Sequence, residues 1–147
     1  MDDVAITKME LSDFYKIYEN LQTDFDEFWT PSILKEELEN KNSSYFVLRK
    51  DETIVGFGGF WVSVDDVHLT NIVIKKGYRS AGLGSYLLEH IINEAKTTGK
   101  QSLTLEVNEE NEPAKKLYLK YGFKILGIRK KYYNNKDNAI IMTLFFN

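Results

Sequence analysis

The sequence predicts a mixed α/β (α+β) fold in a single domain of residues 1–147, with a mostly antiparallel sheet that contains one parallel strand pair and is flanked by helices. Two observations carry this prediction. A strand–helix–strand pattern occupies residues 68–107, and a hairpin pattern lies on each side of it, at 44–64 and 123–146. A strand–helix–strand connection joins parallel strands and a hairpin joins antiparallel ones, so a sheet that contains both is mixed.

The composition is that of an ordinary globular domain. The chain has 147 residues, of which 43% are hydrophobic and 28% charged. It contains no cysteine, which excludes disulfides, thiolate nucleophiles and cysteine-bound zinc. The net charge of −3 does not favour a nucleic-acid surface, and no apolar run is long enough to span a bilayer. No basic-then-apolar segment begins the chain, so we expect a cytoplasmic protein that binds neither nucleic acid nor membrane.

Two helices are expected in the N-terminal part of the chain. Ser12 is a candidate N-cap for the first helix, which would turn Ile17 and Leu21 toward the core. Thr30 and Pro31 combine an N-cap with a proline at the first helical position, and so predict the start of the second helix.

The central unit combines two strands with a regular helix pattern. Residues 68–75 predict a strand, and residues 83–96 carry apolar side chains at three-to-four spacing, which indicates an amphipathic helix. Residues 101–107 alternate apolar and polar side chains, as a half-buried strand does. The two strands are therefore expected to be parallel and joined by a right-handed crossover. A short helix opened by Asn111 and Pro113 follows them.

The turn between the first strand and the helix of this unit is rich in glycine. Residues 79–85 read RSAGLGS and lead directly into the helix. A helix N-terminus has unpaired N–H groups and a partial positive charge, and glycine lets a phosphate group approach both. The turn therefore predicts either a phosphate-binding site or a connection that is merely tight.

Two known phosphate-binding motifs fit this turn incompletely. A P-loop has a lysine followed by serine or threonine after its last glycine, whereas Leu83 and Gly84 occupy these positions here. A dinucleotide-binding fingerprint needs a third glycine where this chain has Leu87, although Glu106 stands roughly where its acidic residue is expected. The P-loop is therefore improbable, and dinucleotide binding remains an alternative.

A third motif fits at every specified position. Residues 79–84 match the pattern Gln/Arg-x-x-Gly-x-Gly/Ala of acyl-coenzyme A pyrophosphate loops, and here the chain resembles the GCN5-related N-acetyltransferase (GNAT) superfamily. The segment LTLEVNEENEPAKKLYLKYGF, residues 103–123, is similar to a later motif of that superfamily. Residues 25–38 and 128–144 resemble a narrower branch, the ribosomal-protein-alanine N-acetyltransferases. The resemblance covers nearly the whole chain in the same order.

The resemblance implies a GNAT fold, in which the two central parallel strands splay apart and bind acetyl-CoA, without a metal. The strand before the turn would pair with the pantetheine arm, the turn amides would face the pyrophosphate, and the asparagine before the short helix would touch the cosubstrate. The implied cofactor-binding residues are Ile72, Val73, Ile74, Arg79, Ser80, Ala81, Gly82, Leu83, Gly84, Ser85 and Asn111.

The resemblance also assigns two catalytic roles. Glu106, near the end of the strand at 101–107, would be the general base that removes a proton from the acceptor amine. Tyr118, on the short helix, would be the general acid that protonates the leaving thiolate. From the residues alone each has a structural alternative: an exposed or salt-bridged glutamate, a tyrosine packed in an apolar stripe, and for Asn111 a plain N-cap.

The function implied is acetyl transfer to the N-terminal amine of a protein, with alanine of a small-subunit ribosomal protein as the expected acceptor. The alternatives are a small amine or lysine acceptor, and a non-catalytic module that binds CoA or a dinucleotide. Asn108 replaces an arginine that is usual in the branch, which puts peptide selectivity in doubt. His68 and His90 belong to no catalytic or metal motif and are expected to be structural. The sequence does not predict an oligomeric state.

Overall fold

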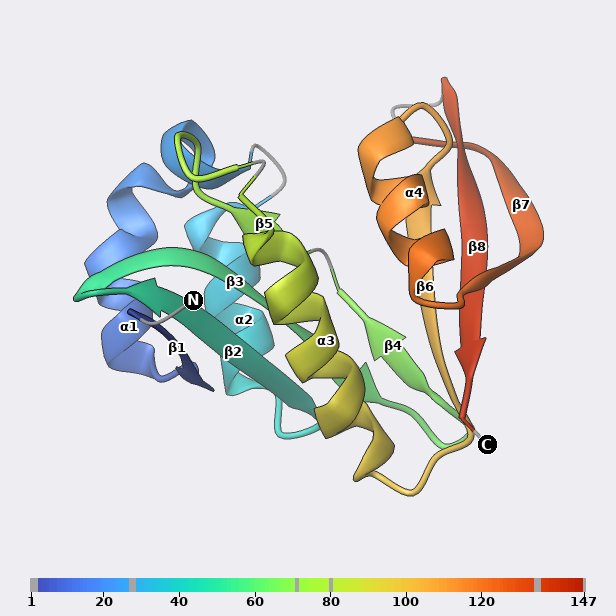
Figure 1. The fold of residues 1–147 in the computed structure, drawn as a ribbon, viewed down its shortest axis with the longest axis horizontal. Coiled ribbons are helices and arrows are strands. Elements are labelled where there is room, and N and C mark those ends of the chain that lie inside the picture. Colours follow the sequence, from blue (N-terminus) through green and yellow to red (C-terminus); the bar gives the residue numbers. More distant parts are fainter. Residues whose placement is uncertain (1–2, 27–28, 71, 80, 134–135, 147) are drawn as a thin grey trace.

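The structure is a computed structural model that describes residues 3–26, 29–70, 72–79, 81–133 and 136–146. An eight-stranded mixed sheet forms its centre, in the order β1-β2-β3-β4-β6-β8-β7 with β5 paired to β3 (Figure 1). The strands are β1 (Val4–Lys8), β2 (Ser43–Lys50), β3 (Thr53–Val62), β4 (Val67–Leu69), β5 (Val73–Ile74), β6 (Ser102–Asn108), β7 (Lys124–Tyr133) and β8 (Asp137–Phe145). Among the described pairings, β4 with β6 is parallel and the others are antiparallel, which confirms the predicted fold class.

Helices cover both faces of the sheet. The helical segments are α1 (Leu11–Ile17), the 3₁₀ turn η1 (Tyr18–Asn20), the π turn η2 (Leu21–Phe25), α2 (Pro31–Glu39), α3 (Leu83–Lys96) and α4 (Glu112–Lys120). Figure 1 shows α3 and α4 in front of the sheet and α1 and α2 behind its β1–β3 half. In the part of the chain that the structure describes, no helix has the length and apolar character needed to cross a bilayer.

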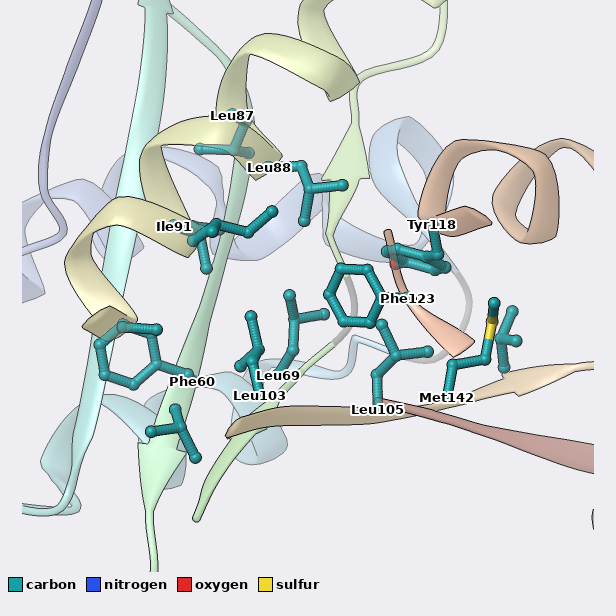
Figure 2. Close-up of a cluster of buried hydrophobic side chains, with 14 of the residues drawn as sticks. Phe60, Leu69, Leu87, Leu88, Ile91, Leu103, Leu105, Tyr118, Phe123 and Met142 are labelled. Atoms are coloured by element: carbon teal, nitrogen blue, oxygen red, sulfur yellow. The ribbon is translucent and has the colours of Figure 1, made fainter. Parts of the chain in front are cut away.

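Two apolar cores hold these layers together. One core lies between α3, α4 and the sheet, and includes Leu87, Leu103, Leu105, Tyr118 and Phe123 (Figure 2). A second core lies on the opposite face, where α1, η2 and α2 pack on β2 and β3. The alternation predicted for residues 101–107 explains the first core, because every second side chain of β6 points into it.

Of the two helix starts predicted in the N-terminal part, the structure confirms that of α2 and corrects that of α1. Thr30 caps α2 as predicted, and its side chain accepts a hydrogen bond of 3.2 Å from the Ile33 N–H. The prediction that Ser12 caps α1 is wrong. Glu10 is the N-cap, and its N–H donates to the Asp13 carboxylate at 2.8 Å, which is part of a reciprocal capping box. Asp13 also forms a buried ion pair with Arg49 of β2, so the side chain that fixes the helix start is chosen by tertiary packing.

The strand predicted at residues 68–75 is broken into β4 and β5. Leu69 pairs with Phe60 of β3, and Val73 pairs with Phe57. Four residue steps on one strand therefore face three on the other (69 to 73 against 60 to 57), so the β4–β5 segment carries one extra residue. A single residue of this kind inverts the direction in which the following backbone groups point.

The break also separates β5 from β6. The parallel pairing of β4 with β6 covers Val67 with Leu103 and His68 with Thr104, whereas β6 continues to Asn108. The described pairings of β5 are with β3 and not with β6. The central parallel pair is therefore splayed, as the resemblance implied.

Two glycines in β3 allow a close approach of the neighbouring chain, Gly58 on the side of the break and Gly59 on the side of β2. A Cβ at Gly58 would lie 3.0 Å from Ile72 Cγ1 and 3.2 Å from its Cα, so the chain after β4 approaches β3 closely there. At Gly59 a Cβ would lie 2.1 Å from the Ser44 carbonyl oxygen of β2. The Gly59 carbonyl accepts hydrogen bonds from the N–H and the hydroxyl of Thr70, at 2.9 Å each, where β4 ends.

We predict that Gly59→Ala destabilises the protein by about 3 kcal/mol, because the new methyl group must displace the backbone of β2. The matched control is Gly127→Ala in β7, where a Cβ would meet Ile141 Cδ1 at an ordinary 3.5 Å and the expected change is below about 0.5 kcal/mol. Denaturant unfolding monitored by circular dichroism measures both changes. Equal stability of the two variants would contradict the close contact at Gly59.

Candidate active site

The split between β5 and β6 presents backbone groups of β5. The Lys75 N–H donates to the Val55 carbonyl of β3 at 2.7 Å, so in the alternating antiparallel ladder the groups of Val73 also point to β3. Those of Ile72 and Ile74 point the other way, toward the split. Of the three residues expected to offer their backbone, Ile72 and Ile74 are thus oriented to do so, whereas the backbone groups of Val73 belong to the sheet.

The glycine-rich turn ends at the N-terminus of α3. Gly82 is the N-cap, with φ of 80° and ψ of 3°, a left-handed conformation that favours glycine. It has no side chain to cap the helix, so the first amides of α3, those of Leu83, Gly84 and Ser85, lie at the positive end of a 14-residue helix. Ala81 is exposed before them, and Ser80 lies outside the described residues. This arrangement suits an anionic group such as a pyrophosphate.

Arg79 fastens the turn to two other segments. Its Nε donates to the Ile74 carbonyl at 2.8 Å, and its Nη2 donates to the Phe25 carbonyl at the end of η2. The guanidinium therefore bonds to backbone carbonyls, at least one of which points into the split. In this conformation, Arg79 connects β5, the turn and the N-terminal helices.

Glu106 lies on the face of β6 opposite the α3–α4 core. Its side chain is 29% exposed, and Oε1 lies 3.1 Å from Nη2 of Arg129 on β7. The other oxygen, Oε2, is buried and has no hydrogen-bond partner among the described residues. Buried polar atoms in proteins are nearly always paired, so a lone carboxylate oxygen beside the split is a candidate substrate contact.

Tyr118 lies on the other face of β6. It projects from α4, is 7% exposed, and packs edge-on against Phe123 with ring centroids 5.5 Å apart (Figure 2). Asn111 is the N-cap of α4 and its side-chain oxygen accepts from the Ala114 N–H at 3.2 Å, so its capping role is confirmed. Glu106 and Tyr118 therefore lie on opposite faces of the sheet, Glu106 on β6 and Tyr118 on α4 in the core that covers the other face. Groups that flank a substrate in the split could act on it from both faces.

A buried tyrosine stands where β4 ends. The Tyr45 hydroxyl donates to Oε1 of Glu37 on α2 at 3.0 Å. Burial raises the pKa of Tyr45 above its usual range, and a hydrogen bond from Thr70 only partly opposes this effect. Tyr45 is consequently a stable donor that ties α2 to the end of β4, a link that the sequence did not indicate.

Other polar side chains near the site form hydrogen bonds or ion pairs with neighbouring residues. Asn108 donates from Nδ2 to Asp137 of β8 at 3.1 Å and accepts the Glu110 N–H at 2.8 Å, so it closes the turn after β6. His68 stacks on Trp61, with centroids 4.2 Å apart, and pairs with Asp66 at 2.7 Å. No group of three or more potential ligands among the described residues could hold a metal ion.

The fold, the splayed strands and the glycine turn together define a class of protein. A family model described as the Acetyltransferase (GNAT) family matches residues 14–123. The chain therefore belongs to this family, and it is an N-acetyltransferase.

Proteins similar to this chain identify the branch of the GNAT family to which it is related. The chain is 39% identical to a protein of Bacillus subtilis (strain 168) named "Putative ribosomal protein bS18-alanine N-acetyltransferase", over 97% of this chain and 96% of the relative. It is 34% identical to the ribosomal protein bS18-alanine N-acetyltransferase of Haemophilus influenzae, over 95% and 97%. The crystal structure of the Escherichia coli ribosomal-protein-alanine N-acetyltransferase superposes with a TM-score of 0.87 at 30% identity, covering 97% of this chain and 93% of that one. The resemblance to this branch is confirmed.

Proposed function

We propose that this protein transfers the acetyl group of acetyl-CoA to the N-terminal alanine of a ribosomal protein of the bS18 kind. The observation that carries the acceptor is similarity to relatives with that name over nearly the full length of both chains. A small amine or a lysine side chain is the alternative acceptor, since the same acetyl-transfer chemistry serves any amine.

Two features of the described chain fit acetyl-CoA as the donor. The backbone of Ile72 and the N–H of Ile74 face the split, where an extended pantetheine arm with two amides could pair like a strand, while the Ile74 carbonyl already accepts from Arg79. The uncapped start of α3 behind Gly82 suits the pyrophosphate. When bound, acetyl-CoA would supply an activated thioester. A non-catalytic binding module is the weaker alternative, because phosphate binding has no use for Glu106 or Tyr118.

In the proposed mechanism Glu106 takes one proton from the acceptor ammonium, which frees the nitrogen lone pair. The nitrogen bonds to the acetyl carbon as the carbon–sulfur bond breaks, and Tyr118 gives a proton to the departing sulfur. The nitrogen loses a second proton as the amide forms. Two protons leave nitrogen and one is taken by sulfur, so each turnover releases one proton after both side chains regain their starting states.

We predict that the acceptor is recognised by its N-terminal alanine. Purified protein and acetyl-CoA should acetylate a peptide with the bS18 N-terminal sequence, and mass spectrometry should place the group on the α-amine. The matched control is the same peptide with a blocked N-terminus and a free lysine. Preferential acetylation of that control, or of a polyamine, would favour the alternative acceptor.

We predict that Glu106→Gln lowers turnover about 100-fold and that Tyr118→Phe lowers it about tenfold, because each removes a proton-transfer group. Acetyl-CoA affinity, measured by calorimetry, should change less than about twofold, since neither group belongs to the pyrophosphate turn. Glu109→Gln, at the residue directly after β6, and Tyr15→Phe, at a half-exposed side chain, are the matched controls and should retain full activity. A Glu106→Gln variant with full turnover at saturating peptide would remove Glu106 from the base role.

A further inference from the structure

Arg129 holds one of the two oxygens of the Glu106 carboxylate. The Arg129 guanidinium is 52% exposed, and its Nη2 lies 3.1 Å from Oε1 of Glu106. The second oxygen, Oε2, is buried and has no partner among the described residues. A carboxylate with one oxygen fixed by a cation and the other unpaired has a defined orientation and one vacant acceptor atom.

The contact requires a long reach across the sheet. β7 carries Arg129 and β6 carries Glu106, and the two strands are separated by β8, so the side chains bridge about 10 Å. Ala139 of β8 is the cross-strand partner of both Arg129 and Asn108, and its small side chain leaves the path over β8 open. Gly127 faces Ile141, the partner of Glu106, and likewise adds no bulk.

We propose that Arg129 is a positioning residue for the general base: it holds Oε1 of Glu106 so that Oε2 meets the acceptor ammonium. This inference rests on the proposed role of Glu106 as that base. Arg129 itself touches neither the amine nor the thioester. It limits rotation of the carboxylate. A fixed acceptor atom is already oriented for proton transfer when the ammonium binds, which lowers the entropic cost of that step.

An ordinary surface ion pair between Arg129 and Glu106 would contribute slightly to stability and would not affect the rate of acetyl transfer. Exposed pairs contribute about 0–1 kcal/mol to stability and have no specific effect on chemistry. Such a pair would leave neither carboxylate oxygen buried and unpartnered. The asymmetry between Oε1 and Oε2 is therefore the feature that points to positioning rather than to fold stability.

A double-mutant cycle of Arg129→Met and Glu106→Gln tests the proposal by single-turnover acetylation of the bS18 peptide. We expect Arg129→Met to slow the chemical step about tenfold in the Glu106 background and less than about twofold in the Glu106→Gln background. Arg129→Lys, which keeps the charge and loses the planar fork, should recover part of the rate. The neighbouring Lys130→Met removes a cation from the same strand and should leave the rate unchanged in both backgrounds.

Three outcomes would overturn the proposal, and they can be told apart. Equal slowing by Arg129→Met in both backgrounds would assign Arg129 a role independent of Glu106. No slowing in either background would reduce the contact to a surface ion pair. A fully active Glu106→Gln single variant would overturn the base role as well, and is seen before the cycle is completed. Thermal unfolding of each variant separates these effects from loss of fold, since the melting temperature should change little.

Discussion

The site depends on one extra residue between Leu69 and Val73. Without it, β4 and β5 would form one strand with a constant ladder to β3, and the same strand would continue beside β6. The extra residue inverts the backbone so that Ile72 and Ile74, rather than Val73, point away from β3. It also ends the parallel pairing at His68. Backbone groups that a continuous sheet would pair thereby face the split next to the start of α3, where the Ile74 carbonyl accepts from Arg79.

The same break distributes the chemistry over two faces. β6 keeps its alternation to Asn108, so Leu105 and Val107 remain in the core with Tyr118 while Glu106 faces the opposite side. Helix α3 supplies an uncapped N-terminus for an anion, and α4 supplies the tyrosine. Each helix is held by burial of an apolar face, so Tyr118 and the N-terminus of α3 are positioned by packing, whereas Glu106 is also held by its contact with Arg129.

Local patterns in the sequence predicted most of the fold. The helix at 83–96, the strand at 101–107, both hairpins and the Thr30 cap all depend on neighbouring residues, and the structure confirms them. Features that depend on distant partners were missed or wrong: the end of β4 at Leu69 with a separate strand from Val73, the cap by Glu10 in place of Ser12, and the exposed edge strand β1. The contact between Arg129 and Glu106 was not predicted for the same reason, since no local pattern places Arg129 beside a residue two strands away. The Glu106 and Tyr118 assignments came from family resemblance, and their catalytic roles remain predictions.

Amide hydrogen exchange of residues 72–74, resolved by residue and compared with and without acetyl-CoA, tests the central claim most directly. In the free protein the Val73 amide should exchange slowly because it bonds to β3, and the Ile72 and Ile74 amides should exchange faster. Saturating acetyl-CoA should slow the exchange of Ile72 and Ile74 at least about tenfold, while NAD at the same concentration should leave them unchanged. Protection of Val73 alone, or equal protection by NAD, would contradict a split whose exposed backbone binds the acetyl donor.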